Sequence, residues 1–182
     1  IRKSQEPLNN QLDQGMRKYI SGLREMYPEK KFYPDANFTM RLTYGKVLPY
    51  TGGDAIEYNF VTTLTGVMEK EDPSNDEFIV PPKLKELYVN KDFGQYAENG
   101  DIITCFLTNN DITGGNSGSP VINGDGELMG LAFDANWEAM SGDIVFEPEL
   151  QRCISVDIRY VLFIIDKFYG GKRLIDEMDL RK

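Results

Sequence analysis

The clearest chemical signal in the sequence is an octapeptide near its middle, residues 113–120, which reads Thr-Gly-Gly-Asn-Ser-Gly-Ser-Pro. Gly115 permits a turn in which its own N–H group and that of Ser117 converge on one oxygen, as the stabilisation of an oxyanion requires. Gly118 leaves room beside the Ser117 hydroxyl, and Pro120 begins the next strand. This pattern predicts that Ser117 attacks a carbonyl carbon, with a turn of no chemical function as the alternative.

A serine hydroxyl is a weak nucleophile until a general base removes its proton. The chain contains no histidine, which excludes a self-contained Ser-His-Asp or Cys-His machinery and most zinc sites. The base for Ser117 must therefore lie on other chain, be a lysine, or be absent. The α/β-hydrolase pattern Gly-x-Ser-x-Gly is not matched around Ser117. We expect neither a metal ion nor a cofactor.

Composition limits the class of protein. The chain has 182 residues, 41% of them hydrophobic, with 20 Lys and Arg against 29 Asp and Glu, which suffices for a packed core and argues against disorder. The net charge of −9 argues against a nucleic-acid partner. The longest apolar run, residues 160–165, is far too short to span a membrane. Cys105 and Cys153 are too few for a disulfide framework and lack metal-ligand spacing.

Hydrophobic periodicity predicts the elements that position the serine loop. In the first third of the chain, apolar residues recur every three or four positions over residues 8–26, which predicts a helix that Pro28 ends. The period then changes to two over residues 38–44, which predicts a half-buried strand. We expect a turn at residues 49–53 and mostly extended chain over residues 58–68, with Gly66 as a bulge.

The residue pattern in the remaining two thirds of the chain predicts short strands followed by helices. Residues 102–107 form an apolar strand, residues 121–133 a hairpin around Asn-Gly-Asp-Gly, and residues 153–156 a further strand. Asp157 is expected to cap a helix that Gly170-Gly171 ends, and a last short helix follows at residues 174–178.

This order favours a mainly β, antiparallel barrel over a βαβ sheet. The chain begins with Ile1-Arg2 rather than Met, and we expect it to be a fragment of a longer protein. The domain organisation that we expect is a helical lead-in over residues 1–28 and a β-barrel over residues 29–182, ending in helices from about residue 157.

The pattern Gly-x-Ser-Gly-x-Pro is similar to the nucleophile loop of chymotrypsin-like serine peptidases, and longer runs extend the resemblance over nearly the whole chain. They resemble the bacterial family of dipeptidyl-peptidases 7 and 11. The runs are residues 33–38 (YPDANF), 91–94 (KDFG), 110–121 (NDITGGNSGSPV), 130–134 (GLAFD), 136–138 (NWE) and 156–160 (VDIRY).

The resemblance implies a fold, an activity and a cellular context. Members of the family are periplasmic or cell-surface exopeptidases of Gram-negative bacteria that remove dipeptides from peptides with a free N-terminus. They join a chymotrypsin-like double barrel to a large helical domain and form homodimers. This chain would be the second barrel, with the first barrel and the helical domain missing. The His and Asp of the triad would lie on the missing part, so the chain alone should be inactive.

The resemblance also implies roles for individual residues. Ser117 would form the acyl-enzyme, and the amides of Gly115 and Ser117 would form the oxyanion hole. Phe133 lies on the strand that runs beside the substrate, and Asp134 would anchor the substrate's α-ammonium group. Ala135 occupies the position that differs between family types, Arg for an acidic P1 residue and Gly for a hydrophobic one. Because alanine lacks the cation that would pair an acidic side chain, we expect a hydrophobic P1.

Two other readings of the sequence stay open. Asp111 lies six residues before Ser117, where trypsin-like enzymes place the acidic floor of the S1 pocket, so an endopeptidase of trypsin or glutamyl type is an alternative. Asp111 belongs to the family run itself, however, and we favour a structural role for it. A non-catalytic barrel module for assembly or peptide binding is the alternative outside the enzymes.

Overall fold

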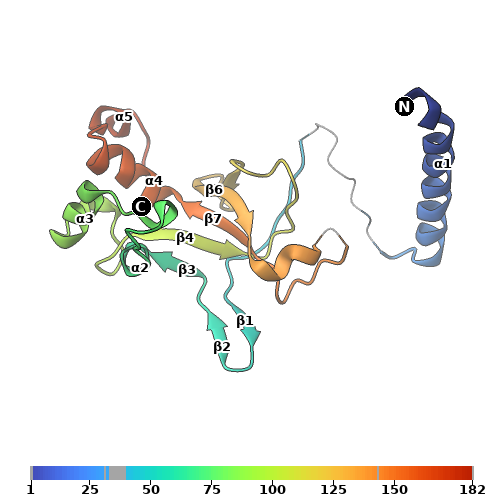
Figure 1. Ribbon diagram of the computed structural model, residues 1–182. Helices are drawn as coiled ribbons and strands as arrows, with labels where there is room; N and C mark the ends of the chain where they lie inside the picture. The colour runs from blue at the N-terminus through green and yellow to red at the C-terminus, as the bar shows by residue number, and fades with distance from the viewer. Residues whose placement is uncertain (1, 31, 33–39, 143, 182) are drawn as a thin grey trace. The chain divides into compact units, whose positions relative to one another are not determined.

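The computed structural model describes residues 2–30, 32, 40–142 and 144–181 (Figure 1). The chain divides between residues 39 and 40 into two compact units, which we describe separately. The second unit begins at Met40. No helix in the described ranges is both long and apolar enough to cross a bilayer.

The first unit is one helix, α1 (Arg2–Met26), as the periodicity predicts. It ends two residues before Pro28, and the Tyr27 amide donates to Leu23 O at 3.0 Å. The side chains of its apolar stripe are largely exposed, with Leu8 and Leu12 each at 65%. The stripe is therefore not buried within this unit.

The second unit is built on a five-stranded sheet with strand order β3-β4-β7-β6-β5, in which every pairing is antiparallel. The expected apolar strand, hairpin and later strand are confirmed as β4, as β5 with β6, and as β7. The bounds are β3 (Val61–Thr63), β4 (Ile103–Thr108), β5 (Pro120–Ile122), β6 (Leu128–Ala135) and β7 (Cys153–Asp157).

Gly130 marks a close approach within this sheet. A Cβ atom at that position would lie 2.7 Å from the Phe106 ring and would also collide with the Val156 carbonyl oxygen. Only a residue without a side chain lets the middle of β6 pack this closely against β4 and β7.

Three expectations for residues 38–68 need correction. Phe38 lies outside the described residues, and residues 40–44 form no strand. The expected turn at residues 49–53 is instead the strand β1 (Tyr50–Gly53), which pairs with β2 (Ile56–Tyr58) in a separate hairpin. The expected extended chain after residue 63 is the helix α2 (Leu64–Glu69), which includes Gly66.

Tertiary packing explains the first and third corrections. Met40, Leu42 and Tyr44 are 98%, 83% and 85% exposed, so the alternating apolar face does not contact the rest of the unit. In α2, Leu64 is fully buried and packs in the core cluster with Val67 and Met68, three and four residues later. Helical spacing matches that contact better than strand spacing does.

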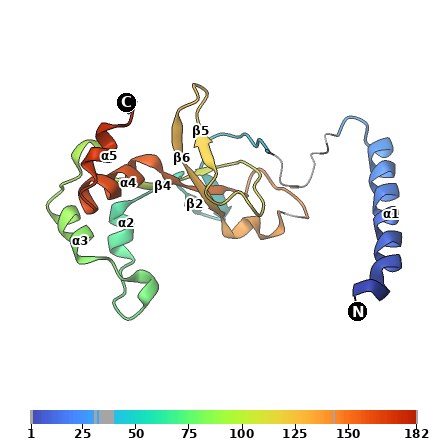
Figure 2. The ribbon, with the colours of Figure 1, turned by 90° about the horizontal axis from the view of Figure 1, so that it is seen from above.

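Helices gather at one end of the sheet (Figures 1 and 2). With α2 they are α3 (Pro82–Val89), α4 (Ile158–Phe163) with a π-helical turn at Ile164–Phe168, and α5 (Lys172–Asp176). Three short 3-10 turns complete the fold, at Asp76–Phe78, Gly94–Tyr96 and Trp137–Ser141. Asp157 caps α4 as expected, since its carboxylate accepts the Arg159 amide at 2.8 Å.

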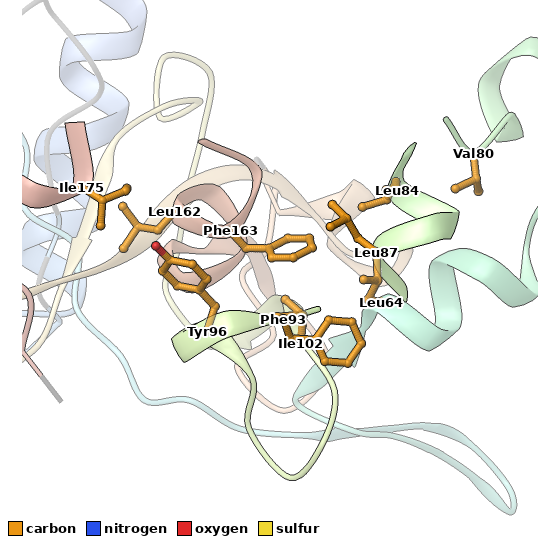
Figure 3. Packing of buried hydrophobic residues seen from close by; sticks show 10 residues of the cluster. All are labelled: Leu64, Val80, Leu84, Leu87, Phe93, Tyr96, Ile102, Leu162, Phe163 and Ile175. Carbon is orange, nitrogen blue, oxygen red and sulfur yellow. The ribbon is translucent and has the colours of Figure 1, made fainter. Parts of the chain in front are cut away.

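The hydrophobic core lies among these helices and is centred on the fully buried Phe163 (Figure 3). The Phe163 ring lies 6.3 Å from that of Phe93 and 6.4 Å from that of Tyr96, in edge-to-face arrangements. The other end of the sheet, where β4 and β6 end and β7 begins, carries loops and the 3-10 turn at Trp137–Ser141 (Figures 1 and 2). The serine loop lies at that end, because it follows β4 in the chain.

Candidate active site

The serine loop leaves β4 at Thr108 and returns to the sheet at Pro120. Two of its glycines have positive φ angles, +96° at Gly115 and +83° at Gly118. Residues with a Cβ atom rarely adopt this conformation. The glycines of the motif are therefore required by the backbone path on both sides of Ser117.

Hydrogen bonds dock the loop onto β6. The Gly118 amide donates to Ala132 O at 2.7 Å, and the Ala132 amide donates to Ser119 O at 2.9 Å. Within the loop, the Asn116 amide donates to Thr113 O at 3.1 Å. By contrast, no acceptor in the described part of the chain takes the amides of Gly115 and Ser117. These two donors are the ones that the motif predicts for an oxyanion.

The Ser117 hydroxyl donates to the carbonyl oxygen of Phe133 at 3.2 Å. A backbone carbonyl accepts a hydrogen bond but has no useful basicity near neutral pH, so this contact positions the hydroxyl without activating it. The structure therefore brings Ser117 and Phe133 together, and a nucleophilic role for Ser117 would require a general base from elsewhere.

A β-bulge at Phe133 determines where the next two side chains lie. Ala132 pairs with Ser155 and Asp134 pairs with Ile154, which leaves Phe133 as the extra residue of β6. Directly paired residues share a face of the sheet. Ala132 therefore lies on the buried face with Ser155, which is fully buried, whereas the bulge moves Asp134 to the other face.

Asp134 and Ala135 end the strand beside the serine loop. The Asp134 side chain is exposed, and its Oδ1 accepts the Ala135 amide at 2.8 Å. This bond holds one carboxylate oxygen and leaves the second available to a ligand. A carboxylate at this place can bind a cation, which is the chemistry that the expected anchor requires.

The residues of the serine loop and of the end of β6 line a pocket of about 330 Å³, a size typical of small-ligand sites. Its lining combines Ser117 and Asp134 with apolar side chains and two polar groups from the loop before β7. The apolar members are Ile112, Phe133, Ala135, Ala139, Met140 and Phe146, and the two polar groups are Gln151 and Arg152. Asp111 also lines this pocket.

Sequence reasoning missed Arg152, a buried cation in this lining that is only 4% exposed. Its guanidinium donates to the carbonyl oxygens of Pro148, Gln151 and Pro49, at 2.7, 2.8 and 2.8 Å. Its Nε has no hydrogen-bond partner in the described chain. No motif marks Arg152 in the sequence, because its partners are backbone atoms, one of them more than a hundred residues away.

Asn136 supports the end of β6 and is 8% exposed. Its Oδ1 accepts the Arg152 amide at 2.7 Å, and its Nδ2 donates to Leu150 O at 2.8 Å and to Glu138 Oε2 at 2.9 Å. The Asn136 amide also donates to Arg152 O at 2.9 Å. One side chain thus fixes the strand end that carries Asp134 and Ala135 to the loop that carries Arg152.

We expect Asn136→Ala to lower the free energy of unfolding by about 2–4 kcal/mol, because it leaves buried groups of Arg152 and Leu150 without partners. The measurement is denaturant unfolding of the full-length protein. Asn90→Ala, at the C-terminal cap of α3, is the matched control and should cost far less. Equal losses for the two variants would contradict the role of Asn136.

The two cysteines do not take part in this site. Cys105 and Cys153 are free thiols on neighbouring strands. Their partners across the β4–β7 ladder are Val156 and Thr108, so the two sulfurs do not face each other. Burial raises the pKa of both thiols, which disfavours the thiolate that a nucleophile or a metal ligand requires. No group of three or more metal-ligating side chains occurs in the ranges that the structure describes.

Comparison with known proteins finds a matching family and similar relatives. The model of the peptidase S46 family matches residues 1–180. Dipeptidyl-peptidase 7 of Phocaeicola vulgatus is 62% identical over 96% of this chain and 25% of its own length. The Asp/Glu-specific dipeptidyl-peptidase of Porphyromonas gingivalis is 52% identical over 96% of this chain and 24% of its own length.

This chain is also similar to a solved crystal structure. The crystal structure of Porphyromonas endodontalis DPP11 in complex with the dipeptide Arg-Glu matches with a TM-score of 0.84 and 51% identity. The match covers 88% of this chain and 23% of that one. The chain thus spans about a quarter of the length of the curated relatives that it matches.

Proposed function

This chain belongs to the peptidase S46 family, and from that premise we propose that it is the serine-bearing part of a dipeptidyl-peptidase that releases dipeptides from free peptide N-termini. The observation that carries the proposal is the pairing of two groups at one pocket. Ser117 contacts the bulge at Phe133, and the same bulge presents Asp134 one residue later. A nucleophile beside an anionic anchor is what cleavage at a fixed distance from an ammonium group requires.

The mechanism then follows from the contacts. Ser117 Oγ attacks the carbonyl carbon of the second substrate residue, and its proton passes to a base on the part of the protein outside this chain. The amides of Gly115 and Ser117 stabilise the oxyanion. The C–N bond breaks, the departing amine takes the proton, and water hydrolyses the acyl-enzyme to release the dipeptide. Asp134 binds the α-ammonium group through the oxygen that does not accept the Ala135 amide.

We extend the proposal to the surroundings of the site. The antiparallel sheet would be part of a chymotrypsin-like barrel, completed by a first barrel and a helical domain elsewhere in the full-length protein. The exposed apolar face of Met40, Leu42 and Tyr44 supports a further packing partner. The homodimer and the periplasmic or cell-surface location stay predictions.

For the P1 residue we propose a hydrophobic side chain. Ala135, Ala139, Met140 and Phe146 offer an apolar lining, and Ala135 supplies no cation. Acidic P1 is the second candidate, because the matched relatives include an Asp/Glu-specific enzyme and a DPP11 bound to Arg-Glu. Arg152 lines the pocket as well, but its guanidinium already donates to several backbone carbonyls, which disfavours pairing with a substrate carboxylate.

The test uses the full-length protein and matched reporters with the sequence Xaa-Leu, one with a free amine and its N-acetylated twin. We expect only the free-amine reporter to be cleaved, because acetylation removes the charge that Asp134 binds. Equal cleavage of both would retain the serine chemistry and reject the dipeptidyl function in favour of an endopeptidase.

A second panel of free-amine reporters varies P1 among Leu, Phe, Asp and Glu. Faster cleavage after Leu and Phe supports the hydrophobic assignment, and faster cleavage after Asp and Glu replaces it with the acidic one. Cleavage of none of the free-amine reporters would favour the non-catalytic module.

A further inference from the structure

A single arginine from a distant part of the sequence contacts the serine loop on both sides of Gly115. Arg41 Nη2 donates to Asn116 Oδ1 at 3.0 Å and to Gly114 O at 3.4 Å. The same nitrogen lies 3.9 Å from the point where a Cβ atom on Gly115 would be. Arg41 is half-buried, although its neighbours Met40 and Leu42 are exposed.

The chain that carries Arg41 is anchored to the end of β4. Val47 forms an isolated antiparallel bridge with Thr108. The Lys46 amide donates to Asn109 Oδ1 at 2.7 Å, and the Asn109 amide returns a bond to Lys46 O at 3.1 Å. Arg41 is therefore held next to the strand from which the serine loop departs.

The Gly114 contact controls the direction of a donor that Arg41 does not touch. A trans peptide unit is planar, so the carbonyl of Gly114 and the N–H of Gly115 point in opposite directions within one rigid plane. Holding Gly114 O on the guanidinium fixes the Gly115 N–H on the other side. Rotation of this peptide would break the Arg41 bond and turn the donor away from the oxyanion position.

The Asn116 contact holds the other side of Gly115. Asn116 Oδ1 accepts both Arg41 Nη2 and the Thr113 amide, the latter at 3.2 Å. Bonds from a guanidinium to neutral acceptors are charge-assisted and stronger than neutral ones. Because Gly115 has no side chain and a φ of +96°, its own conformational preference restrains the loop little, and external contacts must do so.

We propose that Arg41 is a positioning residue for the oxyanion hole, acting through Gly114 and Asn116 to keep the Gly115 amide aimed at the reacting carbonyl oxygen. This role rests on the proposed peptidase function. The Gly115 N–H group donates to the oxyanion of the transition state. Removing Arg41 should therefore lower kcat and leave the affinity for the substrate unchanged.

The experiment compares Arg41→Ala, Arg41→Lys and Asn116→Ala in the full-length enzyme, with Arg173→Ala on the exposed surface of α5 as the matched control. Four quantities separate positioning from general stability. They are kcat and KM for the free-amine reporter, the affinity for a dipeptidyl boronate that forms a tetrahedral adduct on Ser117, and the affinity for the product dipeptide. A fifth, the rate at which a fluorophosphonate labels Ser117, does not depend on the substrate class.

For Arg41→Ala we expect kcat, boronate affinity and labelling rate to fall together by about 10- to 100-fold, less than the loss of an oxyanion donor outright. KM and product affinity should stay within about twofold. Arg41→Lys should recover part of the loss, because an ammonium group keeps the charge and the donors of Nη2 but sits on a flexible chain without the planar, pre-organised geometry of the guanidinium. The double variant Arg41→Ala/Asn116→Ala should lose no more than the worse single variant, and millimolar guanidinium should restore part of the activity of Arg41→Ala.

Two results would overturn the role of Arg41. One is a kcat for Arg41→Ala within twofold of the wild-type value. The other is a fold-loss of product affinity as large as that of kcat, together with a lower unfolding temperature. If no dipeptidyl reporter is cleaved by the wild type, the proposed function fails instead, and the labelling rate decides about Arg41. Labelling that depends on Arg41 upholds the positioning role, and absent or Arg41-independent labelling rejects it.

Discussion

Replacing Ser117 by alanine in the full-length enzyme is expected to lower kcat for free-amine dipeptidyl reporters by about 10⁴- to 10⁶-fold, the range found when a serine nucleophile is removed. The variant lacks the oxygen that we propose to form the acyl bond, while the pocket and Asp134 remain. Product dipeptides should therefore bind with nearly unchanged affinity, measured by calorimetry beside the kinetic assay.

Ser119→Ala provides the matched control for this variant. Ser119 is two residues away, and its hydrogen bonds to Asn116 in the loop and to Ala132 in β6 use backbone atoms, which alanine retains. Its activity should remain close to that of the wild type. A Ser117→Ala enzyme that still turned over at a tenth of the wild-type rate would exclude Ser117 as the nucleophile.

The second large effect is expected for Asp134→Asn. Asparagine keeps an oxygen that accepts the Ala135 amide, so the end of β6 should retain its conformation, and only the charge is removed. Losing a charge partner for the substrate ammonium costs about 2–5 kcal/mol, which corresponds to about 30-fold or more in kcat/KM. The measurement is kcat/KM for the free-amine reporter.

Asp111→Asn is the control for the removal of a charge, because Asp111 lines the same pocket. If Asp134 is the anchor, Asp111→Asn should reduce kcat/KM much less than Asp134→Asn does. The reverse order would identify Asp111 as the specificity carboxylate and support a trypsin-like pocket. Testing both variants on reporters with Lys or Arg at P1 makes this distinction directly.

Local patterns were sufficient to predict the serine loop and most of the second half of the fold. The loop conformation depends on Gly115 and Gly118, whose positive φ angles only glycine adopts readily. The hairpin of β5 and β6 follows from its Asn-Gly-Asp-Gly turn, and the start of α4 follows from Asp157 as its cap. In each case the determining interaction lies within a few residues in sequence.

Elements whose conformation depends on distant contacts could not be predicted this way. Residues 64–69 form a helix because Leu64 packs into the core cluster that also contains Phe163, far along the chain. The alternation of residues 40–44 predicted a strand, yet the half-buried side is the one that carries Arg41. Arg41 and Arg152 were missed for the same reason, since their partners lie far along the chain.

The bulge at Phe133 also limits the kinds of mutation by which this site can diversify. Inserting one residue between Phe133 and Asp134 would pair Asp134 with Cys153 instead of Ile154 and turn its carboxylate onto the face of Ala132 and Ser155, where no water solvates it. Deleting Phe133 would remove the bulge that brings a carbonyl to the Ser117 hydroxyl. Substituting Ala135 changes a pocket wall and leaves the register intact. In a random library, new substrate preferences should therefore arise by point substitution, and single-residue insertions or deletions in this strand should be lost as inactive or unfolded variants.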